Sequence, residues 1–176
     1  MSILDMLKNP ALVEFMKDQR LRELVTKREF RISEEYLHRE LLGAAGDEEL
    51  QGLTLKLHDG YGEIAGTVKK RLLPAIPFSA RFRIGAVTFG PYEKKVHLAM
   101  EAVKPLDLDW VTRKMVERVP FLSWHEGKVA CDLEKVPRLG DLLERRIGDR
   151  RASDLVTIKE LVFRPGEIVA RVGVVL

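Results

Sequence analysis

The sequence predicts an α+β protein in which a long curved antiparallel sheet wraps around one or two helices. The first observation is the stretch from Phe78 to Val103, where apolar and polar side chains alternate with a period of two, as in strands with one buried face. The second is that, beyond residue 50, amphipathic helical patterns are confined to residues 107–119 and 137–147. The third is a set of turn sequences between alternating stretches, among them Asp59-Gly60.

The first 43 residues predict short helical pieces and no strand. Asn9-Pro10 ends one piece and starts the next, because proline suits the first helical position. Ser33 is a predicted N-cap for a later piece, in which Tyr36, Leu37 and Leu41 share a face and Gly43 is the stop. We expect residues 1–29 to form a helical N-terminal arm and residues 30–176 to form the α+β domain.

Period-two alternation begins at Leu50, and it continues in most of the chain that follows. Leu53, Leu55 and Leu57 alternate with polar residues before the Asp59-Gly60 turn. A last hairpin is predicted around Pro165-Gly166. The expected strands are 50–58, 62–70, 78–89, 94–104, 124–132, 155–163 and 167–175.

The two helices follow from apolar spacing and from their end signals. Over 107–119, apolar residues including Val111 and Met115 lie on one side, and Pro120 closes the helix. Pro137 opens the second helix, whose apolar residues run to Ile147 and which Gly148 ends.

Length and composition are typical of one ordinary globular domain. The chain has 176 residues, a formal net charge of +3, an isoelectric point near 9.0 and one cysteine, so no internal disulfide is expected. The first seven residues lack the basic and apolar regions of a secretory signal, and no stretch has the length of a transmembrane helix. We expect a cytoplasmic protein, with membrane association as an open alternative.

No residue pattern in the chain predicts catalysis, a metal site or a bound cofactor. His58-Asp59 lies in a predicted turn, and the four histidines are dispersed without metal-ligand spacing. Cys131 is in phase with apolar neighbours and has no predicted activating base. No glycine-rich phosphate loop occurs. We therefore expect a protein that is not an enzyme, with no catalytic residue, no metal and no cofactor.

Two clusters of basic residues admit two interpretations, solvated surface charge or contact with an anionic membrane surface. No aromatic residues are interleaved with them, so nucleic acid is not an expected partner. If the protein meets anionic membranes, these residues should form one exposed face. They are Lys69, Lys70, Arg71, Arg145, Arg146, Arg150 and Arg151.

The order of these elements resembles the tubular lipid-binding (TULIP) superfamily, and most closely its single-domain bacterial phospholipid-binding branch. The resemblance covers about residues 30–176 and depends on the capped segment Ile32-Ser33-Glu34, the long strands around Asp59-Gly60 and the last hairpin. It implies a curved sheet around a long helix, with acyl chains held between them. Members of that branch usually carry an export signal or a lipid anchor, and neither is seen in this sequence.

The leading functional hypothesis is non-enzymatic binding of a lipid or another apolar molecule in a groove between the sheet and a helix. The alternative is an interaction or oligomerisation module with a filled core, which acts through its N-terminal helices and could form a homo-oligomer. The side chains expected to line the groove are Leu55, Ile64, Phe82, Ile84, Leu98, Met100, Val111, Met115, Ile168 and Val172.

Overall fold

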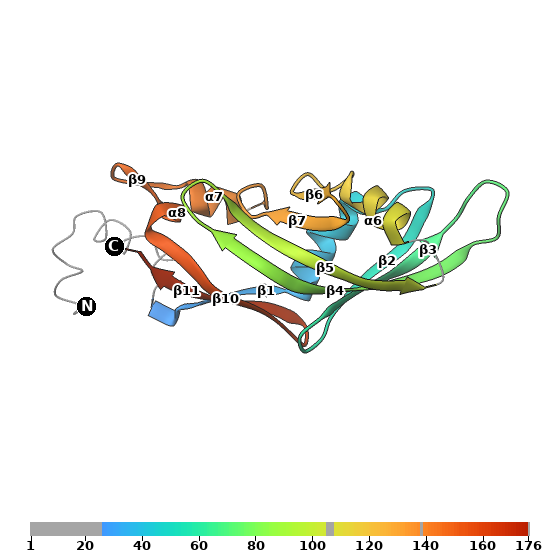
Figure 1. The fold of residues 1–176 in the computed structure, drawn as a ribbon, viewed down its shortest axis with the longest axis horizontal. Coiled ribbons are helices and arrows are strands. Elements are labelled where there is room, and N and C mark those ends of the chain that lie inside the picture. Colours follow the sequence, from blue (N-terminus) through green and yellow to red (C-terminus); the bar gives the residue numbers. More distant parts are fainter. Residues whose placement is uncertain (1–25, 105–107, 138, 176) are drawn as a thin grey trace.

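The protein, seen in a computed structural model that describes residues 26–104, 108–137 and 139–175, is elongated and consists mainly of antiparallel strands (Figure 1). The strands are β1 (Glu29–Ser33), β2 (Leu50–Leu57), β3 (Gly62–Val68), β4 (Ile76–Phe89), β5 (Lys94–Lys104), β6 (Leu122–His125), β7 (Lys128–Asp132), β8 (Arg146–Ile147), β9 (Arg150–Arg151), β10 (Val156–Arg164) and β11 (Glu167–Val174). The helical elements are α4 (Glu34–Leu37), η1 (His38–Leu42), α5 (Gly43–Ala45), α6 (Leu108–Val116), α7 (Leu139–Glu144) and α8 (Ala152–Leu155). The expected helical arm of residues 1–29 lies almost entirely outside the described residues and stays a prediction.

The strands form two sheets and one small hairpin. The larger sheet has the order β2-β3-β4-β5-β7-β6, the smaller has the order β1-β11-β10, and β8 pairs with β9. Each of these pairings is antiparallel, as predicted. The amide of Gly60 donates to the carbonyl of Phe163 at 3.1 Å, and that of Gly166 donates to Leu57 at 3.2 Å. These bonds connect the β2–β3 turn to the β10–β11 hairpin, so the two sheets are joined where these hairpins turn.

The prediction of one continuous sheet was wrong, because the C-terminal hairpin pairs with a strand that the sequence analysis placed among helices. In β1, Phe30 lies opposite Ala170 and Ile32 opposite Ile168. The edge of β11 that faces away from β10 offers backbone hydrogen-bond partners, and these partners favour an extended conformation in β1. The expected single strand 124–132 is also a hairpin, since Glu126 (φ 49°) and Gly127 (φ 78°) adopt the positive φ angles of a tight two-residue turn.

The larger sheet is concave because its long central strands are bulged. The register between β4 and β5 shifts twice, between Ala80 and Phe82 and between Ile84 and Val87. Such bulges bend a strand and increase its twist. Alternate residues of β4, including Phe78 and Phe82, are buried on the concave side, whereas Arg81 and Arg83 are exposed.

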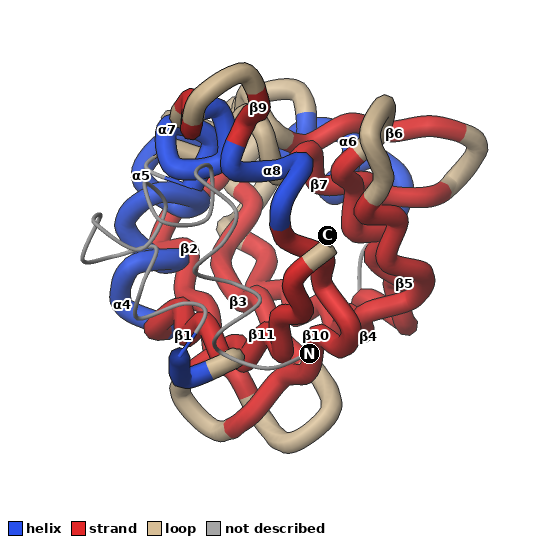
Figure 2. Tube along the Cα trace, turned by 90° about the vertical axis from the view of Figure 1, so that its left-hand side faces the viewer, coloured by secondary structure: helices blue, strands red, loops and turns tan. Residues whose placement is uncertain are grey.

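The helical elements close the open side of this curved wall. Seen down the long axis, the strands curve around the interior and α4, α5, α7 and α8 complete the enclosure (Figure 2). We call α4, η1 and α5 together the helical segment 34–45. The predicted cap is confirmed, since the Ser33 Oγ accepts a hydrogen bond from the Tyr36 amide at 3.2 Å.

The two predicted helices are both shorter than expected. The helix expected over 107–119 is α6, which ends at Val116. The helix expected over 137–147 is α7, which ends at Glu144. Gly148, with a φ of 63°, then turns the β8–β9 hairpin instead of ending a helix.

Candidate functional site

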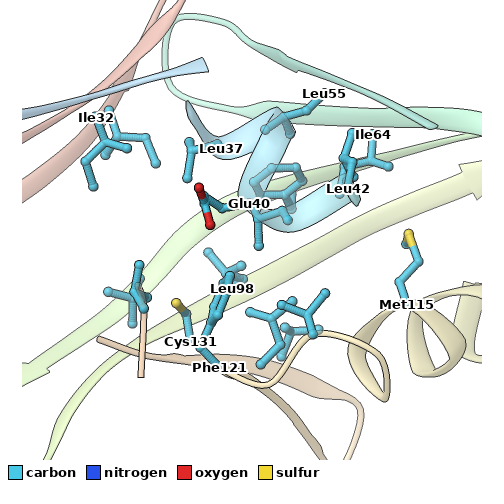
Figure 3. A pocket seen from close by; sticks show the side chains of 18 of the residues that line it. Ile32, Leu37, Glu40, Leu42, Leu55, Ile64, Leu98, Met115, Phe121 and Cys131 are labelled. Carbon is cyan, nitrogen blue, oxygen red and sulfur yellow. The ribbon is translucent and has the colours of Figure 1, made fainter. Parts of the chain in front are cut away.

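An apolar cavity of about 150 Å³ lies between the concave wall of strands and the helical segment 34–45 (Figure 3). We call it the main cavity. Strands β2, β3, β4, β5 and β7 and the β10–β11 hairpin contribute one wall. The helical segment 34–45, α6 and the loops after α6 and β7 contribute the other.

Eight of the ten side chains expected to line a groove lie on the wall of the main cavity. Seven of them reach it because residues two apart in a strand point to the same face, and the concave face is the apolar one. Met115 reaches it from α6. These eight are Leu55, Ile64, Phe82, Ile84, Leu98, Met100, Met115 and Ile168.

The other two expected side chains lie elsewhere. Val111 is fully buried in a packed cluster with Val68 and Phe78, beside the main cavity but not on its wall. Val172 lines a second cavity of about 60 Å³.

Sequence reasoning missed the helical wall of the main cavity. Leu37, Leu41 and Leu42 project from the helical segment 34–45 towards the strands, and Ala45 completes this side. The sequence carries a signal for this wall, since the spacing of Tyr36, Leu37 and Leu41 places them on one helix face. What the sequence could not supply was the element against which that face packs.

Gly62 permits the close packing of one aromatic side chain on the cavity wall. A Cβ atom at this position would lie 2.3 Å from Cζ of Phe82, which sits opposite on β4. The Phe82 ring packs edge-on against Phe163 of β10, with ring centroids 5.4 Å apart. The glycine therefore leaves space on β3 for an aromatic ring that also contacts the smaller sheet.

Polar side chains are few on the described wall of the main cavity. The Tyr36 hydroxyl donates to the carbonyl of Pro137 at 2.5 Å, which ties α4 to the start of α7. Glu40, whose carboxylate accepts from Arg39 Nε at 3.3 Å, lines the cavity from η1 with its side chain 25% exposed (Figure 3). Thr112 is 2% exposed, and its Oγ1 has no hydrogen-bond partner among the described residues.

Cys131 contributes its side chain to the main cavity from β7 (Figure 3). Burial, and secondly the negative charge of Asp132, raise the pKa of this thiol to about 12. A thiol with such a pKa is almost entirely protonated at neutral pH and is a poor nucleophile. Its surroundings are those of a small apolar side chain.

The second cavity continues the apolar space along the long axis. Four side chains, Ile32, Leu133, Leu139 and Leu161, line both cavities and separate them. On β4, Phe82 lines the main cavity and Phe89 the second. At about 3.3 Å per residue, these two positions are about 20 Å apart along the strand.

The two basic clusters do not share one face. Lys69, Lys70 and Arg71 lie in the loop between β3 and β4, at one end of the long axis. The cluster from Arg145 to Arg151 surrounds the β8–β9 hairpin at the other end (Figure 1). The single face that was expected if both clusters contact an anionic membrane is therefore not formed.

The His58-Asp59 pair considered from the sequence lies in the turn between β2 and β3. His58 stacks on Tyr61 with ring centroids 4.6 Å apart, and the Asp59 side chain is largely exposed in the turn. Within the described residues, no group of three or more His, Cys, Asp or Glu side chains could hold a metal ion. None of the described helices is long and apolar enough to cross a lipid bilayer.

Fold and cavity together define a curved antiparallel-sheet protein with an apolar interior space. Comparisons with models of known protein families, with curated proteins and with solved structures each found no significant match to this chain. The resemblance to the tubular lipid-binding superfamily stays a prediction.

Proposed function

We propose that this protein binds an apolar or amphipathic molecule, of which a lipid acyl chain fits best, in the main cavity and without catalysing a reaction. The observation that supports the proposal is a cavity of about 150 Å³ whose wall is almost entirely aliphatic and aromatic. Protein interiors normally contain few voids larger than a water molecule. An apolar void of this volume stays dry and accepts an apolar guest as large as benzene.

The energetics of an empty cavity favour an occupant. At about 24 cal/mol per Å³ of residual void, a cavity of this size forgoes about 4 kcal/mol of stability. An apolar ligand that makes contacts with the wall recovers part of this free energy. The cavity is also at odds with a filled core, which the alternative of a pure interaction module requires.

The shape of the apolar space favours a chain over a compact ligand. The main and second cavities share four lining side chains and extend about 20 Å along β4. One leaflet of a bilayer holds its acyl chains within about 15 Å, half of the hydrocarbon thickness. A single acyl chain therefore fits the length of the two cavities if the separating side chains rotate.

Mass spectrometry of freshly purified protein tests this proposal directly. Native spectra and organic extracts should contain a co-purified lipid, and a fluorescent fatty-acid probe should bind stoichiometrically to delipidated protein. Absence of both an extractable lipid and saturable probe binding would refute the proposal.

A matched pair of variants on β5 tests whether the ligand lies in the main cavity. Leu98→Trp places a larger side chain in the main cavity, whereas Ala99→Trp makes the same addition on the exposed face of the strand. We expect Leu98→Trp to weaken probe binding by about tenfold or more and Ala99→Trp to leave it unchanged. Thermal melts of both variants establish that each is folded, and equal probe affinity in the two would place the ligand elsewhere.

A further inference from the structure

The loop between β3 and β4 combines exposed cations with exposed aliphatic side chains. Every residue from Lys69 to Ala75 in this basic loop (residues 69–75) is exposed, with Leu72 at 94% and Leu73 at 55%. The loop projects from one end of the long axis (Figure 1). It has three cations and no acidic residue.

The basic loop has a firm base. The amide of Lys69 donates to the carbonyl of Glu49 at 2.8 Å, and the amide of Leu73 donates to that of Lys70 at 3.0 Å. The flanking residues Val68 and Phe78 are 3% exposed and belong to a packed cluster with α6. The exposed leucines are therefore presented by a supported turn.

An aromatic side chain lies next to the cations. The Lys70 Nζ is 4.3 Å from the centroid of the Trp110 ring on α6, and the Lys114 Nζ is 5.4 Å from it. Tryptophan, lysine and arginine are the residues that occur at the boundary between lipid headgroups and acyl chains. Cations at this boundary contact phosphates while adjacent aliphatic side chains enter the apolar layer.

We propose that the basic loop is a membrane-docking site, in which Leu72 and Leu73 insert into the surface of an anionic lipid bilayer and Lys69, Lys70 and Arg71 contact its phosphates. The positive charge of the basic loop favours an anionic lipid surface over a neutral one. A second protein would bury about 20–30 residues on each side of a stable interface, which a seven-residue tip does not offer. A bilayer demands no complementary shape, so a small tip suffices. This docking is separate from ligand binding in the main cavity.

Vesicle flotation with matched variants tests the docking site. Wild type should bind vesicles of phosphatidylcholine with phosphatidylglycerol at low salt, and bind weakly to phosphatidylcholine alone. Lys69→Glu/Arg71→Glu and Arg146→Glu/Arg150→Glu each lower the formal net charge of +3 by four, at opposite ends of the molecule. We expect the first variant to lose binding by about tenfold or more and the second by much less.

A second matched pair of variants tests how much the exposed leucines contribute to vesicle binding. Leu72→Ser/Leu73→Ser removes the exposed leucines, and Tyr92→Ser removes a side chain that is 98% exposed in the turn between β4 and β5. The leucine variant should lose vesicle binding at low and at high salt, and the tyrosine variant should retain it. In a Trp124→Phe background, Trp110 is the sole tryptophan, and its emission should shift to shorter wavelength on vesicle addition.

Three outcomes would overturn the proposal. These are equal binding by the two charge-reversal variants, binding of the leucine variant at the wild-type level, and a loop-dependent dimer that forms without vesicles. Each can be separated from ligand binding, because the loop variants leave the cavity wall unchanged and should bind the fatty-acid probe like wild type.

Discussion

The two ends of the long axis are both rich in basic residues, but the surroundings of these residues differ. At the basic loop, Lys69 and Arg71 are exposed beside the exposed Leu72. At the β8–β9 end, Arg151 lies 3.8 Å from carboxylate oxygens of both Glu134 and Asp154. Glu134 also pairs at 3.2 Å with Lys94, which is 1% exposed.

This comparison shows that a run of cations has no fixed role. At the β8–β9 end, Arg151 lies beside the carboxylates of Glu134 and Asp154, and a packed apolar cluster that includes Leu133 and Ile147 lies nearby. The other arginines of this end, including Arg146 and Arg150, are exposed. At the basic loop, apolar side chains accompany the charge and face outward. The first arrangement stabilises the fold, and the second leaves a surface available for a partner.

The largest expected difference between the ends is in thiol reactivity. Cys131 packs against the cluster at the β8–β9 end, and its pKa is raised from 9.0 to about 12. At about pH 8 its thiolate population, and hence its alkylation rate, should be about 1,000-fold below that of Leu72→Cys measured in a Cys131→Ala background. Mass spectrometry after iodoacetamide treatment measures both rates.

Denaturant and pH provide the controls for that prediction. In urea the two thiols should react alike, and a native Cys131 rate within tenfold of the loop cysteine would contradict the raised pKa of this thiol. Because the folded pKa lies above the unfolded one, the contribution of the neutral thiol to stability is full below about pH 9. It is lost as the pH rises towards 12.

Glu134→Gln should give the next largest effect. The substitution leaves Lys94 buried without its counter-charge, and we expect the free energy of unfolding to fall by about 3 kcal/mol. Adding Lys94→Met should restore most of this loss. The exposed pair Glu93–Lys95 is the control, since Glu93→Gln should change stability by less than about 1 kcal/mol in urea titrations. Equal effects of the two glutamate substitutions would show that burial does not distinguish these pairs.

Backbone strain at the β8–β9 turn is a smaller effect. Gly148 has a φ of 63°, so Gly148→Ala should lower the free energy of unfolding by about 1 kcal/mol. Gly43 has a φ of −60°, and a Cβ there would meet nothing within 4 Å. Gly43→Ala should therefore raise stability by up to about 1 kcal/mol. Thermal melts of both variants measure the difference, and a shared sign would contradict the assigned backbone geometry.

The smallest effect is expected at the basic loop itself. Leu72→Ser/Leu73→Ser should change the free energy of unfolding by less than about 0.5 kcal/mol, because these side chains are exposed. Ile147→Ala at the other end, where the side chain is 3% exposed, should lower it by about 3 kcal/mol. A marked loss in the leucine variant would mean that the loop packs on the domain.

Most strands of the larger sheet, and the turns at Asp59-Gly60 and Pro165-Gly166, could be predicted because their signals are local. The alternation from Phe78 onward and the turns at Asp59-Gly60 and Pro165-Gly166 depend on residues a few positions apart, and Gly60 (φ 83°) and Gly166 (φ 78°) have the expected positive φ angles. Alternation in the strands predicted seven of the side chains on the wall of the main cavity, and helical spacing predicted the eighth, Met115. The sequence could not show whether those side chains fill the core or leave a space, since packing depends on the opposing wall.

By itself, the sequence determined the antiparallel strands, their apolar face and the capped start of the helical segment at Ser33, because strand period, turn geometry and capping are properties of neighbouring residues. Tertiary structure alone decided that β1 pairs with β11, that the helical segment 34–45 forms a cavity wall, and that Glu134 lies beside both Lys94 and Arg151. It also decided that Leu72 stays in solvent. These outcomes depend on contacts between segments that are far apart in the chain. Such contacts form only when the whole interior is assembled, so no local sequence pattern predicts them.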